Sequence, residues 1–324
     1  MINPLVTVTV FSYNQADYIC DAIESVINQT YSNLEIIIID NGSTDGSKDL
    51  IAQYLSDKRV VFLNHIDNEK FSIRQNEACA IANGKYIGIL YADDYYLPNK
   101  IENQVNIFET LDDSYGVVHG PGFIKKLNSD QLTLSPCAKV SGYCFNSLLD
   151  NWSDGFCNPI SPLARKECYM EFPADEDVFF GGGEGLFLFF SLRYQFYYLD
   201  EPLVVMREHK KNAGKRVKSN TDTHNVLMTK LIHHKEVPTE SIPHIHKHLS
   251  YFKMNTAWHI LRTNDDLSYA RNLYFQAIRV YPKNLINFKQ LLGLFLSFCP
   301  SFLVRIFNQI SFLFFNKKHF HGIE

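Results

Sequence analysis

Apolar and polar residues alternate with two different periods along the first 120 residues of the chain. Short apolar runs that suit β-strands occur at residues 5–11, 34–39, 59–63, 86–91 and 116–119. Between these runs, residues 17–28, 71–83 and a segment opening at Pro98 carry apolar side chains at helical spacing. This alternation predicts an α/β fold: an open, mainly parallel, Rossmann-like sheet flanked by helices, with right-handed crossovers.

Polar residues follow three of the predicted strands at the point where each strand ends. They are Ser12, Tyr13 and Asn14 after the first strand, Asp40 and Asn41 after the second, and Asp93 and Asp94 after the fourth. In open sheets of this kind, ligands bind beyond the carboxyl ends of the strands. We therefore expect an aromatic ring, a polar turn and a carboxylate pair to converge on one crevice.

The adjacent carboxylates Asp93 and Asp94 suggest a metal site. Charge at the end of a buried strand is costly unless something positive meets it. A carboxylate pair without neighbouring thiolates or histidines prefers a hard cation, Mg²⁺ or Mn²⁺, whose other positions phosphate oxygens can fill. The implied ligand is a nucleoside diphosphate, with Tyr13 stacking on the base. The alternative is a solvated turn that caps the next helix.

Composition and charge exclude several classes of protein. The chain has 324 residues, of which 46% are hydrophobic and 20% charged, as in a folded protein with one large and one smaller domain. A net charge of −4 provides no global field for recruiting nucleic acid. The seven cysteines form no CxxC pair and suit a reducing cytosol. The N-terminus has no basic segment before its apolar run and is interpreted as a strand, not a signal peptide.

Four motifs in the first third of the chain together resemble a known family. They are the strand ending in SYN (12–14), QTYSNLEI (29–36), DNGSTD (40–45) and the late pair DD (93–94). In this order and spacing they resemble the family-2 inverting glycosyltransferases with the GT-A fold, of the bacterial surface-polysaccharide type. The resemblance is strong over residues 4–120 and weaker to about residue 210.

The resemblance implies a nucleotide-sugar donor, with UDP as the default nucleotide, a divalent metal and inversion at the anomeric carbon. It places Tyr13 against the base and Asp40 and Asn41 on the base edge. It places Asp93 beside the ribose and makes Asp94 the metal ligand. The chain has Asn41 where the family usually has Asp, which leaves the choice of base more open because an amide both donates and accepts.

The resemblance also bears on the catalytic base, which an inverting transfer needs to deprotonate the acceptor hydroxyl. The family commonly supplies it from a Glu-Asp pair before a helix and an LDEPL strand. Here LDEPL (199–203) is intact and Glu184 opens the helix, but Gly185 stands in place of the Asp. Glu184 is the first choice for the base; it is also readable as a helix-terminal charge. Asp175, Glu176 and Asp177 are nearby substitutes.

The remaining third of the chain has a different character, and we expect a boundary between a transferase domain at 1–215 and a helical region at 216–324. The basic stretch 207–218 is either a solvated loop, a flap over the diphosphate or a patch for anionic lipid, and its His209 is a candidate to complete the metal shell. Pro300 breaks the apolar tail, and neither half reaches the roughly 20 residues of a spanning helix. It is interpreted as two helices lying in a membrane interface, or as a docked pair that covers a core or a dimer face.

These observations predict an inverting, metal-dependent glycosyltransferase that builds a surface polysaccharide. Its expected partners are a nucleotide sugar, a saccharide or lipid-linked acceptor and the membrane surface, with a homodimer left open. The expected location is cytoplasmic, peripheral at the inner face of the cell membrane. The alternatives are a nucleotidyltransferase, against which the absence of a phosphate loop after the first strand argues, and an inactive sugar-nucleotide-binding protein.

Overall fold

The computed structural model describes residues 3–126, 129–152, 158–175, 184–209, 217–263, 266–283 and 288–315, without the side chains of Glu184 and residues 310–315. Contacts between residues divide the chain into two compact units, Met1–Asn212 and Ala213–Glu324.

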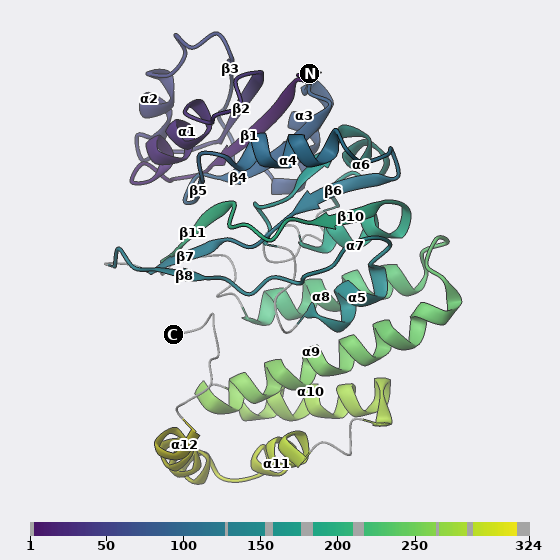
Figure 1. The fold of residues 1–324 in the computed structure, drawn as a ribbon. Helices are drawn as coiled ribbons and strands as arrows, with labels where there is room; N and C mark the ends of the chain where they lie inside the picture. Colours follow the sequence, from purple (N-terminus) through teal and green to yellow (C-terminus); the bar gives the residue numbers. More distant parts are fainter. Residues whose placement is uncertain are drawn as a thin grey trace. The chain divides into compact units, whose positions relative to one another are not determined.

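A seven-stranded sheet forms the centre of the first unit (Figure 1). Its strand order is β10-β6-β9-β4-β1-β2-β3, and only β9 runs antiparallel to its neighbours. The strands are β1 (Val6–Ser12), β2 (Leu34–Asn41), β3 (Val60–His65), β4 (Tyr86–Tyr91), β6 (Tyr115–His119), β9 (Leu163–Arg165) and β10 (Gln195–Tyr198). The predicted mainly parallel α/β sheet is confirmed.

Helices cover this sheet, whose central strands are buried on both faces. All seven residues of β1 are buried, and Val6, Val8 and Val10 pack in one core with residues of α1 and α4. Burial on both faces explains why LEIIII in β2 shows no alternation. The helices of this unit are α1 (Ile19–Ile27), α2 (Ser47–Ala52), α3 (Phe71–Ile81), α4 (Lys100–Phe108), α5 (Phe145–Asp150), α6 (Lys166–Glu171) and α7 (Glu184–Arg193).

A second, four-stranded sheet lies beside the end of β4. Its order is β5-β11-β7-β8, formed by β5 (Tyr95–Tyr96), β11 (Val204–Glu208), β7 (Phe123–Lys126) and β8 (Leu132–Leu134). β5 begins directly after Asp94, and β11 pairs with it antiparallel, Val205 opposite Tyr95. This small sheet therefore brings the chain near residue 207 to the turn that follows β4.

The second unit is helical, as predicted, and has its own hydrophobic core. It contains α8 (Val217–Ile232), a 3₁₀ turn at Thr239–Ser241, α9 (Ile242–Thr263), α10 (Leu267–Val280), α11 (Phe288–Leu296) and α12 (Ser301–Phe315). Its core joins α9, α10 and α11 through apolar residues such as Ala257, Leu273, Tyr274 and Leu296. Within the described part of the chain, we find no helix with both the length and the hydropathy needed to cross a bilayer.

Candidate active site

The carboxyl ends of β1 and β2 present two buried oxygen atoms side by side. Ser12 lies opposite Asp40 in the register of the two parallel strands. Both residues are almost fully buried, yet Ser12 Oγ and Asp40 Oδ2 have no hydrogen-bond partner among the described residues. A buried polar atom left unpaired is costly, so this pair of atoms is suited to meet polar groups of a ligand.

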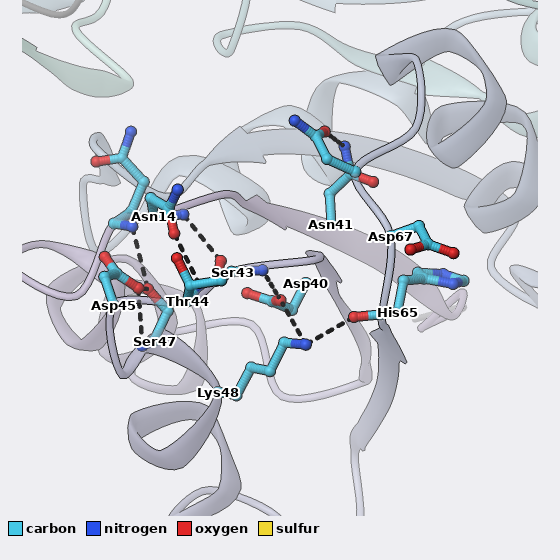
Figure 2. A network of polar contacts seen from close by, with 12 residues as sticks. Asn14, Asp40, Asn41, Ser43, Thr44, Asp45, Ser47, Lys48, His65 and Asp67 are labelled. Carbon is cyan, nitrogen blue, oxygen red and sulfur yellow. Dashed lines mark hydrogen bonds and ion pairs between the residues drawn. The ribbon is translucent and has the colours of Figure 1, made fainter.

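The loops that follow β1 and β2 hold each other in place (Figure 2). The Asn14 N–H donates to Ser43 Oγ (2.8 Å), and the Thr44 N–H donates to Asn14 Oδ1 (2.9 Å). Asn14 adopts a left-handed backbone with φ of 53°, which asparagine tolerates better than most residues. These bonds fix the backbone beside Tyr13 and leave its ring 45% exposed, accessible for stacking.

Asp40 is held by one of its oxygens only. Its Oδ1 accepts the Ser43 N–H at 2.8 Å and lies 3.8 Å from Lys48 Nζ, while Lys48 also donates to the His65 carbonyl (2.7 Å). The Lys48 ammonium partly compensates the buried negative charge. Asp40 Oδ2 remains as an oriented acceptor at the strand end, as Figure 2 shows from close by.

The side-chain amide of Asn41 makes its hydrogen bonds within the protein. Its amide nitrogen donates to Asn68 Oδ1 and the Glu69 carbonyl (both 2.8 Å), and its Oδ1 accepts from the Glu69 N–H (3.0 Å) and Arg74 Nε (2.9 Å). Asn41 therefore ties the end of β2 to the segment before α3. Its predicted role at the base edge stays a prediction, and Asp40 is the better placed of the two.

The turn at Asp93 and Asp94 meets residues from the far end of the unit. Asp94 Oδ1 accepts the Arg207 backbone N–H at 2.8 Å, and Asp93 Oδ2 lies 3.0 Å from His209 Nε2. The Ala92 N–H donates to the Phe11 carbonyl (2.9 Å), which ties this turn to the end of β1. The strand-end residues named from the sequence are thus gathered at one edge of the sheet, and His209 joins the carboxylate pair.

The electrostatics of the turn disfavour two full negative charges. Burial raises the pKa of Asp94 well above its ordinary value, and repulsion from Asp93 adds to this effect, against an opposing contribution from Arg207. A cation bound at the pair would lower the pKa of Asp94, because a nearby positive charge favours the ionised carboxylate.

Arg207 is the functional candidate that the sequence did not single out. Its guanidinium donates to the Asp93 carbonyl (Nη1, 3.1 Å), pairs with Asp21 of α1, and lies over the rings of Tyr95 (4.6 Å) and Tyr18 (5.5 Å). In the sequence it belonged to a basic run. The available signal was its spacing from His209, which follows the last residue of β11, because residues two apart in an extended chain face the same side.

The donor set at this turn fits a hard divalent cation. Asp93 Oδ2 lies 3.0 Å from His209 Nε2, Asp94 is the next residue of the turn, and Mg²⁺ or Mn²⁺ needs only one or two carboxylates when phosphates complete its shell. In the described residues there is no cluster of three or more His, Cys, Asp or Glu side chains arranged around a common point. The protein alone therefore supplies a partial site, which suits an ion that arrives with a diphosphate.

The predicted base is placed only in part. Glu184 begins α7, but its side chain lies outside what the structure describes, as do Glu176 and Asp177. Asp175 is described and lies next to Ala174, whose backbone exchanges two hydrogen bonds with the Asn76 amide of α3. The role of Glu184 stays a prediction.

The sequence of the chain is similar to those of known proteins. Residues 7–158 match the sequence model of a family described as "Glycosyl transferase family 2". The Escherichia coli protein named UDP-Glc:alpha-D-GlcNAc-diphosphoundecaprenol beta-1,3-glucosyltransferase WfaP is 39% identical over 106 residues, 33% of this chain and 42% of that protein. This chain spans less than half the length of the first curated relatives that it matches.

Two solved structures share the fold at low sequence identity. S. aureus TarS 1–349 in complex with UDP-GlcNAc has a TM-score of 0.64 and 13% identity, covering 95% of this chain and 91% of that one. Mannosyltransferase PcManGT from Pyrobaculum calidifontis, in complex with GDP-Man and Mn²⁺, has a TM-score of 0.57 and 17% identity, covering 98% and 89%.

Proposed function

We propose that this chain, whose residues 7–158 match the model of glycosyltransferase family 2, transfers a sugar from a nucleoside-diphosphate donor, a UDP-sugar by preference, with inversion. The acceptor is a hydroxyl of a lipid-linked saccharide in surface-polysaccharide biosynthesis, reached from the inner face of the membrane. The name of the WfaP protein, with UDP-Glc and a diphosphoundecaprenol acceptor, and the UDP-GlcNAc complex of TarS support this choice, whereas the PcManGT complex contains GDP-Man.

The observation that carries the proposal is the buried carboxylate turn at Asp93 and Asp94, met by His209 beside the open ends of β1 and β2. We assign Asp94, Asp93 and His209 to holding Mg²⁺ or Mn²⁺. A divalent cation bound there supplies Lewis-acid stabilisation of the charge that grows on the departing diphosphate.

The residues of the chain then have separate tasks. Tyr13 stacks on the base, while Asp40 Oδ2 accepts a base N–H and Ser12 Oγ completes that edge. The acceptor oxygen forms a bond to the anomeric carbon as the bond from that carbon to the phosphate oxygen breaks, and its electron pair leaves with the diphosphate. Glu184 takes the proton of the acceptor hydroxyl. The transition state resembles an oxocarbenium ion.

The test is a transfer and hydrolysis assay with a panel of nucleotide sugars, with Mn²⁺ or with chelator, on wild type and Asp94→Asn. Asparagine retains an oxygen for the Arg207 N–H but lacks the charge, so we expect a loss of about 10²–10³ in rate with the fold intact. Asp130→Asn, a matched change at a fully exposed carboxylate, should leave the rate unchanged.

The products distinguish the alternatives. Release of nucleoside diphosphate, with an inverted anomeric configuration by NMR, supports the proposal. Release of pyrophosphate from a nucleoside triphosphate would instead identify a nucleotidyltransferase. Tight donor binding without turnover of any donor would identify an inactive binder, and wild-type turnover by Asp94→Asn would refute the assigned carboxylate.

A further inference from the structure

The outer side of α11 carries an uninterrupted apolar stripe. Phe288, Leu291 and Phe295 follow one another at intervals of three and four residues, which places them on one side of the helix, and Phe298 lies in the turn just after the helix ends. Phe288 is 78% exposed, Phe295 66% and Phe298 56%. Gln290, Gly293 and Leu296 are buried, so the helix already uses its other side for packing.

α12 has the same division into an inner and an outer side. Val304 is buried, Phe307 packs against the core of the unit, and the Asn308 amide donates to the carbonyls of Leu261 and Arg262 (2.9 and 3.1 Å). These contacts fix the rotation of the helix. They leave Phe302, Leu303 and Ile306 outside, with Phe302 60% exposed.

We use the name aromatic face for the exposed apolar residues of these two helices and of the turn between them. Its members are Phe288, Leu291, Phe295, Phe298, Phe302, Leu303 and Ile306. Both helices pack on α9 at the C-terminal end of the unit (Figure 1). Large aromatic side chains gathered in this way on a surface mark a site of interaction.

The charges in this part of the sequence identify the kind of surface that would cover it. Residues 267–323 contain no aspartate and no glutamate, although the whole chain has a net charge of −4. The same segment contains seven basic residues: Arg271, Arg279, Lys283, Lys289, Arg305, Lys317 and Lys318. An apolar face in a purely basic segment complements a bilayer rich in anionic phospholipid.

We propose that the aromatic face binds the surface of an anionic phospholipid bilayer, with α11 and α12 lying in the interface. This inference deepens the proposed function, which places the acceptor at the inner face of the membrane. It concerns residues that take no part in sugar transfer, so vesicle binding and sugar transfer can fail separately. A second copy of the chain fits less well. In a two-fold dimer, the basic segments of the two copies would face each other. Neither copy of residues 267–323 contains a carboxylate that could offset the positive charge of the other.

Vesicle co-sedimentation of the full chain tests this inference. Vesicles of phosphatidylcholine alone are compared with vesicles containing about one-third phosphatidylglycerol. We expect binding to the anionic vesicles, little binding to the neutral ones, and release as salt rises to ~0.5 M. The double variant Phe295→Ser/Phe302→Ser should bind at least about tenfold more weakly, because the apolar contribution scales with the buried area.

Matched variants separate surface chemistry from folding. Leu134→Ser changes an exposed apolar residue of β8 and should bind like wild type. Arg305→Glu leaves the aromatic face intact but should weaken binding to anionic vesicles. Unchanged Trp258 fluorescence and circular dichroism verify that each variant is folded.

Two results would overturn the inference. One is equal binding of wild type and the folded Phe295→Ser/Phe302→Ser variant to anionic vesicles. The other is a dimer, detected by light scattering and dissolved by the same substitutions, in a chain that does not sediment with vesicles. That second result would assign the aromatic face to self-association.

Discussion

Arg207 connects three parts of the candidate site through a single side chain. It links the carbonyl of Asp93 to Asp21 of α1, and its backbone N–H binds the neighbouring Asp94. A planar guanidinium can make these bonds in fixed directions and also stack on aromatic rings, which a lysine ammonium cannot do. We therefore interpret Arg207 as a positioning residue that sets the geometry of the carboxylate turn.

The substitution Arg207→Lys tests this role. It retains the positive charge and the backbone N–H, but it loses the fork between Asp93 and Asp21. We expect the Mn²⁺ concentration for half-maximal activity to rise about tenfold, with a smaller change in kcat, because about 1–3 kcal/mol of charge-assisted bonding is lost. Metal titration of the donor-hydrolysis rate measures the effect. Lys125→Gln, on neighbouring β7, should be neutral, and a normal metal dependence in Arg207→Lys would exclude the role.

The positions of single residues at the ends of long strands could be predicted from the sequence, whereas their roles stay predictions. Asp40, Asp93 and Asp94 were named from their place after apolar runs, and the sheet gathers those strand ends because β1 pairs with both β2 and β4. The contact between His209 and Asp93 joins residues 116 positions apart. No local periodicity encodes such a contact, so the sequence could offer His209 only as a candidate.

Elements were predictable in proportion to their length. The strands of six to eight residues at β1 to β4 were all located, whereas β5 and β9, with two and three residues, were missed because they are too short to show a period. The helix predicted over residues 71–83 is shorter in the structure, where α3 ends at Ile81. A Cβ at Gly84 would lie 2.7 Å from Thr7 Oγ1, so this glycine allows close approach to β1.

Among the helices, α10 should show a pH-dependent stability because of the residue that caps its N-terminus. Asp266 Oδ1 accepts the Tyr269 N–H (3.0 Å), and Oδ2 pairs with Lys218 of α8 (3.0 Å). The Tyr269 N–H, then Ser268 and Lys218, lower the pKa of Asp266 to about 2. A depressed carboxyl pKa stabilises the fold above the unfolded value of about 4, and this contribution is lost as pH falls toward 2.

Urea unfolding of Asp266→Ala checks this prediction. At pH 7 the lost cap should reduce the free energy of unfolding by about 1 kcal/mol, and the difference from wild type should shrink between pH 4 and pH 2. Asp266→Asn retains a capping oxygen and should cost less. Trp258 fluorescence in a Trp152→Phe background reports the second unit specifically, since the chain has two tryptophans. A pH-independent difference would contradict the assigned titration.

At the scale of the whole molecule, the residues assigned to the donor and the metal and those of the aromatic face lie in different parts of the chain. The residues assigned to the donor and the metal, from Ser12 to His209, belong to Met1–Asn212, whereas the aromatic face belongs to Ala213–Glu324. Each unit has a core of its own, one around β1, β2 and β4 and the other around α9 and α10. The helical character of the second unit was predicted from the sequence, but the exposed side of α11 and α12 was not. Apolar residues cover those helices nearly all round, and only packing decides which of them turn inward.

This separation predicts that damage to the second core leaves donor chemistry intact. Leu273 is 1% exposed in the centre of that core, so Leu273→Ala should lower the unfolding free energy reported by Trp258 by about 2–5 kcal/mol. Donor binding and metal-dependent donor hydrolysis, measured below the shifted transition, should stay at the wild-type level because none of the assigned donor or metal residues lies in that unit. Val10→Ala, which creates a comparable cavity in the core around β1, should weaken donor binding and also lower the free energy of unfolding. Loss of donor hydrolysis in folded Leu273→Ala would show that the second unit contributes to the donor site, and the assignment of that site to the first unit alone would be wrong.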